Sequence, residues 1–248
     1  MADWVPGTVI DTRQWNETHF SVRIDAPVED FQAGQFLKVG LDVGDERVGR
    51  AYSFVNAPHE RPLEIFFNTV PEGPLSNRLA SLRSGDSIWV TPKANGMLTL
   101  REVRQDAREL WLLATGTAIG PFLSILRTHA PWERFERVVL AYGVRRARDL
   151  AYQDLVAELR ELHPERLAYV PLVTRERVDG ALARRIPAAL EDGSLERRAR
   201  LRLDPARAHA MLCGNSGMIK DAAAVLEARG LTRHRRNEPG HYSLEKYH

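Results

Sequence analysis

The hydrophobic pattern of this chain changes near residue 100, and no other feature constrains the fold as strongly. Up to about residue 96, short runs of alternating apolar residues are separated by turn residues; in one run, Phe20, Val22 and Ile24 share a face. Short strands at this close spacing predict an antiparallel barrel or sandwich. After residue 110, continuous apolar runs alternate with amphipathic helical segments, which predicts a parallel sheet with helices on both faces.

The chain is long enough for both parts. Its 248 residues are 44% hydrophobic, which suffices for one large domain or two of moderate size. The polar segment 97–109 is suited to join the two parts. One helical segment interrupts the strand-rich half, where Leu75, Leu79 and Leu82 recur at helical spacing.

Composition and charge exclude several classes of protein. No run of about 18 apolar residues occurs, so we expect no membrane-spanning helix. The N-terminus lacks the basic and apolar regions of a secretory signal. Cys213 is the single cysteine, which excludes an intramolecular disulfide and any site built on several thiolates from this chain; a reducing cytoplasm is the expected location. The net charge of +2 is too small to indicate nucleic-acid binding.

Two segments of the second half have the form of a nucleotide-binding edge. In ATGTAIGPF (114–122) an apolar run leads through Gly116 and Gly120 into a helix, where a pyrophosphate binds in many parallel sheets. Ala118 and Pro121 depart from the G-x-G-x-x-G pattern, so a plain strand-to-helix turn is an equal alternative. LCGNSGMIKD (212–221) repeats the arrangement. Its Cys213 is more commonly a buried structural thiol than a reactive one.

Two further segments carry cations. Thr174 and Arg175 end an apolar run and Arg185 follows; a hydroxyl and two guanidinium groups suit an adenosine 2′-phosphate, with a solvated arginine-rich surface as the alternative. In RAYSFVNAP (50–58), Arg50 is suited to a phosphate, and the ring beside it suits stacking on a conjugated system. A barrel strand with two outward polar side chains is the alternative interpretation of that segment.

The three motifs RAYS, ATGTAIGPF and LCGN, in this order and near this spacing, resemble the ferredoxin–NADP(+) reductase family. The bacterial flavodoxin/ferredoxin reductase branch is the most similar, and the resemblance extends over essentially the whole chain. It implies a six-stranded antiparallel FAD-binding β-barrel at 1–100. It also implies a Rossmann-like NADP(H)-binding α/β domain at 101–248, whose C-terminal tail returns to the flavin.

The resemblance assigns roles at the FAD site. Arg50 would pair with the pyrophosphate, Tyr52 would pack against the isoalloxazine and Ser53 would lie near its N5 atom. Phe66 to Thr69 would run alongside the ring. The segment Pro74 to Ser76 would meet the pyrophosphate, with the backbone amides of Leu75 and Ser76 as donors, because proline has no N–H. The full implied set is Arg50, Ala51, Tyr52, Ser53, Phe66, Phe67, Asn68, Thr69, Pro74, Leu75, Ser76, Thr117, Tyr247 and His248.

The resemblance also assigns the NADP(H) site and the residues nearest the reacting atoms. Cys213 would face the nicotinamide, and Tyr247, preceded by Glu245, would be the terminal aromatic ring that moves aside for it. His248 stands where relatives have a tryptophan packed on the FAD adenine. The implied catalytic set is Ser53, Cys213, Glu245 and Tyr247. The implied NADP set is Gly116, Val144, Arg145, Thr174, Arg175, Arg185, Asn215, Ser216, Gly217 and Asp221.

The implied activity is hydride transfer from NADPH to flavin N5, followed by single-electron transfer to ferredoxin or flavodoxin. No metal is expected, and the partner complex is expected to be transient and electrostatic, aided by the arginines of 233–236 in a monomeric enzyme. One alternative is a flavin-dependent NAD(P)H oxidase or diaphorase without a protein partner. Others are a non-catalytic electron-transfer subunit, which the single cysteine disfavours, and a dinucleotide-binding regulator.

Overall fold

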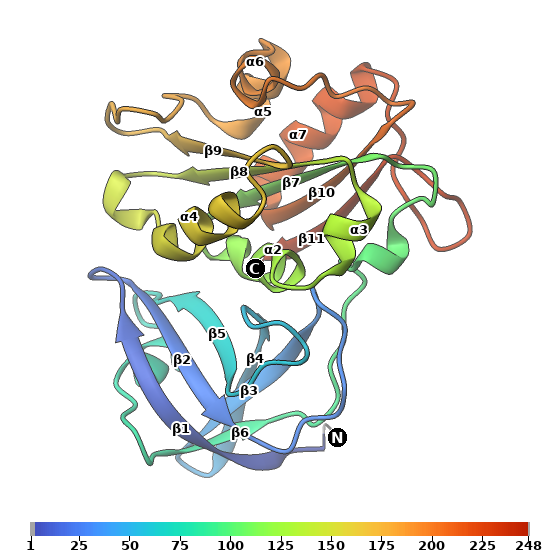
Figure 1. Cartoon of the computed structure of the whole chain (residues 1–248). Helices are drawn as coiled ribbons and strands as arrows, with labels where there is room; N and C mark the ends of the chain where they lie inside the picture. The colour runs from blue at the N-terminus through green and yellow to red at the C-terminus, as the bar shows by residue number, and fades with distance from the viewer. Residues whose placement is uncertain (1–2, 248) are drawn as a thin grey trace. The chain divides into compact units, whose positions relative to one another are not determined.

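The computed structural model describes residues 3–247, which form two compact units (Figure 1). The first, here the barrel unit, comprises the chain up to Thr99 together with Gly120–Thr128. The second, here the parallel-sheet unit, comprises Leu100–Ile119 and the chain from His129 onward. The sequence predicted two domains with limits at 1–100 and 101–248. Those domain limits remain a prediction, since the compact units divide the chain differently and place 120–128 with the barrel unit.

Within the described residues, the barrel unit contains one six-stranded antiparallel sheet with the order β4-β3-β6-β1-β2-β5. A bridge between Phe54, just beyond the end of β4, and Ile65 in β5 joins the two outer strands, which closes the sheet into the predicted barrel. The strands are β1 (Val5–Gln14), β2 (His19–Asp25), β3 (Phe36–Val43), β4 (Glu46–Ser53), β5 (Leu63–Asn68) and β6 (Ser87–Val90).

Alternation along the strands fills the barrel. On β2, Phe20, Val22 and Ile24 are buried as their spacing predicted, whereas Arg23 is exposed and forms an ion pair with Asp11. The predicted helix around Leu79 is short: α1 spans only Ser76–Ala80, and Leu79 enters the barrel core.

Helix α2 (Gly120–Leu126) belongs to the barrel unit although it follows the first strand of the other unit. It is fully buried, and its Ser124 Oγ donates a hydrogen bond of 2.7 Å to the backbone oxygen of Asn56. Arg127, just beyond α2, forms an ion pair of 2.8 Å with Glu60. These contacts hold α2 against the loop that follows the end of β4.

The parallel-sheet unit has the order β11-β10-β7-β8-β9 among its described strands, and every neighbouring pair is parallel. The chain builds outward from β7 to β9 and then returns to the other side of β7, so the topological switch point lies between β7 and β10. The strands are β7 (Glu109–Thr115), β8 (Arg137–Val144), β9 (Leu167–Val173), β10 (Ala208–Asn215) and β11 (Tyr242–Tyr247).

Helices cover both faces of this sheet, as predicted (Figure 1). Helices α5, α6 and α7 pack on one face, where they form a continuous apolar core with the strands, and α3 and α4 lie on the other. The helices are η1 (Leu100–Glu102), η2 (Gly116–Ile119), α3 (Ala130–Arg134), η3 (Ala147–Asp149), α4 (Gln153–Leu162), α5 (Ile186–Glu191), α6 (Ser194–Ala199) and α7 (Ser216–Ala228).

A buried histidine lies where β10 begins. The side chain of His209 is fully buried, and its Nε2 atom is 2.6 Å from Ser243 Oγ. Its Nδ1 atom has no hydrogen-bond partner among residues 3–247, which favours a neutral ring with the proton on Nε2. Burial, together with the nearby His234, lowers the pKa of His209 to about 3.

We expect this histidine to make the protein acid-sensitive. An unfolded histidine titrates near 6.5, so the folded state loses stability as the pH falls below that value, by about 2 kcal/mol at pH 5. His209→Gln keeps a hydrogen-bond donor but cannot titrate, and it should lose less stability over this range. Guanidinium unfolding of both proteins at pH 7 and pH 5 measures the difference. Equal losses in the two proteins would contradict the assignment.

Candidate functional site

The end of β4 carries three predicted site residues with unused polar groups. Arg50 is exposed, and its guanidinium donates only to the adjacent Gly49 backbone oxygen, with no carboxylate partner among the described residues. Ser53 is buried, and its Oγ atom has no hydrogen-bond partner within residues 3–247. A buried hydroxyl of this kind normally has a partner. A ligand with an anionic part and a polar ring edge fits this pair, as FAD does.

Tyr52 lies between them and is largely buried. Its ring meets Phe67 edge-on at 5.8 Å between centroids, and burial raises the pKa of Tyr52 to about 12, so the phenol stays neutral. Arg50 and Tyr52 are two residues apart on a strand and share one face, whereas Ala51 is exposed on the other. The ring is therefore held in place by the barrel itself.

The strand β5 turns its two aromatic rings to opposite faces. Phe67 enters the barrel core beside Tyr52, whereas Phe66 packs against Trp15 and His19, with centroid distances of 6.1 and 5.8 Å. Only one of these rings can therefore pack on a ligand at a given face of the strand. The next two predicted residues are less buried; they are Asn68 and Thr69.

The loop before α1 is closed by its own side chains. Ser76 Oγ accepts a hydrogen bond of 3.0 Å from the Val70 amide, and Asn77 Nδ2 donates to the Val70 backbone oxygen. Leu75 is buried and Pro74 is exposed. At the N-cap of α1, Leu75 makes no side-chain capping bond within the described chain, so the first amides of α1 are left for a ligand.

The switch point of the parallel sheet is lined by backbone and by one unpartnered hydroxyl. Gly116, directly after β7, has a φ of 58°, which favours glycine. A Cβ atom on Gly214 would lie 2.1 Å from Thr115 Oγ1, so the ends of β7 and β10 approach too closely for any side chain there. Thr115 Oγ1 is buried without a hydrogen-bond partner in the described part of the chain. Thr117, in the turn η2, is half-buried.

Three of the four predicted catalytic residues meet on β10 and β11. In the strand register Cys213 lies opposite Glu245, and the Cys213 thiol hydrogen-bonds Tyr247. Burial, reinforced by the Glu245 charge, raises the pKa of the Cys213 thiol well above its usual range, so the thiol stays protonated. Ser53 lies in the barrel unit. His248 lies outside the described residues.

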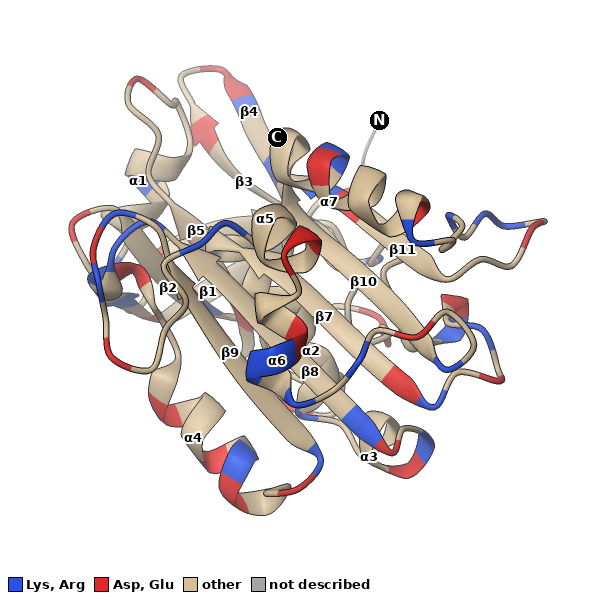
Figure 2. Cartoon of the chain, turned by 90° about the horizontal axis from the view of Figure 1, so that it is seen from above, with Lys and Arg blue, Asp and Glu red and all other residues tan. Residues whose placement is uncertain are grey.

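The predicted 2′-phosphate residues gather at the carboxyl ends of β8 and β9. The Thr174 amide donates to the Val144 backbone oxygen at 3.2 Å, and the Arg175 amide donates to that of Arg145 at 2.9 Å. Arg185 is the N-cap of α5 and is exposed. Within residues 3–247, the guanidinium groups of Arg145, Arg175 and Arg185 have no carboxylate partner, unlike Arg184, which pairs with Asp192. Figure 2 shows Lys and Arg on the loops at this edge.

The remaining predicted NADP residues begin α7. Asn215 caps the helix, because its Oδ1 atom accepts a hydrogen bond of 2.9 Å from the Met218 amide. The next two residues, Ser216 and Gly217, form the exposed first turn, and Asp221 is exposed one turn later. The Asn215 side-chain oxygen is therefore occupied by the helix cap, and its NH2 group remains as a hydrogen-bond donor for a ligand.

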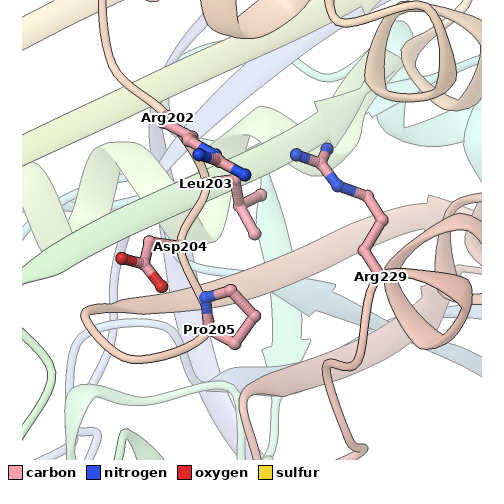
Figure 3. Close-up of a pocket in the computed structure, with 5 residues that line it drawn as sticks. All are labelled: Arg202, Leu203, Asp204, Pro205 and Arg229. Atoms are coloured by element: carbon pink, nitrogen blue, oxygen red, sulfur yellow. The ribbon is translucent and has the colours of Figure 1, made fainter.

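A pocket of about 380 Å³ lies elsewhere in the parallel-sheet unit (Figure 3). Its lining consists of residues that no motif pointed to, namely Arg202, Leu203, Asp204, Pro205 and Arg229. The Arg229 guanidinium is already paired with Glu196 at 2.7 Å. Among the described residues, no group of three or more His, Cys, Asp or Glu side chains is arranged to hold a metal ion. Nor does any described helix combine the length and apolar character that a membrane span needs.

Comparison with known proteins defines the class. Residues 9–94 match the family model of the oxidoreductase FAD-binding domain, and residues 112–224 match that of the oxidoreductase NAD-binding domain. The chain is therefore built as a two-domain oxidoreductase of the kind that binds a flavin and a nicotinamide nucleotide.

Full-length relatives define the family. The chain is 46% identical to a flavodoxin/ferredoxin–NADP reductase of Shigella flexneri and 45% identical to that of Escherichia coli (strain K12), in each case over 248 residues and all of both chains. The crystal structure of a ferredoxin NADP+ reductase from Neisseria gonorrhoeae with bound FAD and NADP matches with a TM-score of 0.94, at 31% identity and covering 99% of each chain. The chain belongs to the flavodoxin/ferredoxin–NADP reductase family.

Proposed function

We propose that the protein is an FAD-dependent oxidoreductase that moves electrons between NADP(H) and a one-electron carrier, ferredoxin or flavodoxin. The observation that carries this proposal is the pair of unused polar groups on β4, the buried Ser53 hydroxyl and the Arg50 guanidinium, among the described residues. The full-length relatives support the same activity, because their names state it. FAD, when bound, supplies the means of splitting a pair of electrons into single electrons.

The barrel unit binds and orients the flavin in this proposal. Arg50 binds the pyrophosphate through charge-assisted hydrogen bonds, and Tyr52 supports the ring system with a face fixed by packing against Phe67. The Ser53 hydroxyl would donate a hydrogen bond to the ring edge. The first amides of α1 add further donors to the pyrophosphate. No side chain has to act as an obligate acid or base, because the residues position the ring and tune its electronics.

The parallel-sheet unit binds the nicotinamide nucleotide. We assign the nicotinamide to the cluster of Cys213, Glu245 and Tyr247, with the Tyr247 ring as the group that must yield its place. The protonated Cys213 thiol contributes shape and a weak donor rather than a nucleophile. The guanidinium groups of Arg175 and Arg185 bind the 2′-phosphate in this proposal. Thr117 as a flavin contact stays a prediction.

The basic segment 233–236 contributes little to carrier docking in this proposal. It precedes β11, so its arginines lie at the amino end of that strand and Tyr247 lies at the carboxyl end. Six strand residues span roughly 17–20 Å, which exceeds the Debye length of about 10 Å at 0.1 M salt. We further propose a transient electrostatic complex and a monomeric, cytoplasmic enzyme, which the single thiol suits.

A coupled assay tests the proposed function. Purified protein, NADPH and cytochrome c are mixed with and without catalytic amounts of flavodoxin or ferredoxin. We expect the carrier to raise cytochrome c reduction by at least about 10-fold, with an effect that falls as the salt concentration rises. A protein that oxidises NADPH but shows no response to either carrier is instead an oxidase or diaphorase. A protein that cannot retain FAD contradicts the whole proposal.

A further inference from the structure

The segment that carries Arg145 and the segment that carries Arg175 are joined by side chains as well as by backbone. The backbone bonds from Thr174 and Arg175 extend the β8–β9 ladder by two residues. Beyond them, the Glu176 carboxylate accepts a hydrogen bond of 2.5 Å from the Ala147 amide, at the start of η3. This contact lies two residues beyond Arg145 on one segment and one residue beyond Arg175 on the other.

The turn that follows Arg145 is thus held by carboxylates on both sides. Asp149 Oδ2 accepts a hydrogen bond of 3.0 Å from the Arg146 amide within the turn, and Glu176 holds the Ala147 amide from the neighbouring segment. Without Glu176, the described contacts between the segments end at the Arg145 backbone oxygen. Arg145 and Arg175 are exposed, so their relative position depends on these backbone ties.

We propose that Glu176 is a positioning residue for recognition of the NADP 2′-phosphate, because it holds the turn that follows Arg145 against the segment that carries Arg175. The inference rests on the proposed function. The negative charge of Glu176 repels an anion that binds near Arg145 and Arg175. Its hydrogen bond to the Ala147 amide favours the binding of that anion, because it holds the two segments together. The two effects have opposite signs, so suitable variants separate them.

The test measures binding of adenosine 2′,5′-bisphosphate and of 5′-AMP to the FAD-loaded protein by calorimetry. Glu176→Ala removes the tie, and we expect it to weaken 2′,5′-bisphosphate binding by roughly 5- to 10-fold, about the net value of one intramolecular hydrogen bond. It should leave 5′-AMP binding within about twofold. Glu176→Gln keeps the acceptor and removes the charge, so its 2′,5′-bisphosphate affinity should equal or exceed that of the parent protein.

Asp179→Ala is the matched control, because it removes a charge from the same loop where the described chain provides no tie. It should not weaken binding. The inference is overturned if Glu176→Ala binds the 2′,5′-bisphosphate as tightly as the parent, or if it weakens both ligands equally. If the parent protein itself fails to prefer the 2′,5′-bisphosphate over 5′-AMP, the NADP assignment fails as well. That outcome distinguishes failure of the proposed function from failure of this inference alone.

Discussion

Replacing both Arg175 and Arg185 with alanine is expected to lower kcat/KM for NADPH by roughly 100- to 1,000-fold. Each guanidinium would lose a charge-assisted bond to the 2′-phosphate worth about 1.5–2 kcal/mol, and each 1.4 kcal/mol is a factor of ten. NADH has no 2′-phosphate, so its kcat/KM should change by less than about threefold. Steady-state rates with the two nucleotides, and an artificial acceptor in excess, give both numbers.

The matched control removes the same charge elsewhere. Arg160→Ala with Arg236→Ala changes the net charge equally at exposed positions of the same unit. This control should leave the NADPH/NADH ratio within about twofold, because surface charges at a distance are screened. An unchanged ratio in the Arg175/Arg185 double variant would remove the 2′-phosphate assignment and leave the alternative of a solvated arginine-rich surface.

Gly214→Ala is expected to reduce the free energy of unfolding by about 2–4 kcal/mol, from overpacking and backbone strain together. The new Cβ atom would meet Thr115 Oγ1 at 2.1 Å and Met218 Cε at 2.9 Å, and the φ of +152° disfavours a side chain. The ends of β7 and β10 would have to separate, so nucleotide binding at the switch point should weaken as well. Guanidinium unfolding measures the first effect and nucleotide titration the second.

Two further variants separate the clash from the backbone term. Gly230→Ala also places a side chain at positive φ, but its Cβ would meet nothing within 4 Å in the described chain, so it reports the backbone cost alone, about 1 kcal/mol. Thr115→Ala combined with Gly214→Ala removes the closest contact and should recover part of the loss. A Gly214→Ala protein that is no less stable than Gly230→Ala would show that the close approach of β7 and β10 has no energetic importance.

Periodicity predicted the architecture because most elements have one buried face. Phe20, Val22 and Ile24 are buried as their spacing indicated, and the uninterrupted apolar strands are those of a sheet covered on both sides. Strand β11 was not predicted, because an edge strand buries little, and its clearly buried residues are Tyr242 and Ser243. No element was predicted in the arginine-rich segment 184–207, yet it contains α5 and α6, whose apolar residues Ile186 and Leu195 enter the core of the parallel-sheet unit.

The candidate site was predictable where chemistry lies within one motif. Arg50 and Ser53 are close in sequence, and the structure leaves both with unused polar groups among the described residues. Pairings that depend on strand register were beyond the sequence; Cys213 meets Glu245 only because β11 adds to β10 in parallel. The roles inferred for Thr115 and Glu176 have the same origin, since each depends on a contact between segments far apart in the chain.

The central claim is that this chain holds FAD on β4 and reduces it with NADPH. An anaerobic absorbance spectrum of the purified, FAD-reconstituted protein, taken before and after NADPH is added, tests that claim most directly. We predict flavin bands corresponding to about one FAD per chain, bleached by NADPH within seconds and by NADH far more slowly, as expected of an enzyme selective for the 2′-phosphate. A colourless protein after reconstitution, or flavin bands that NADPH leaves unchanged, would contradict the account.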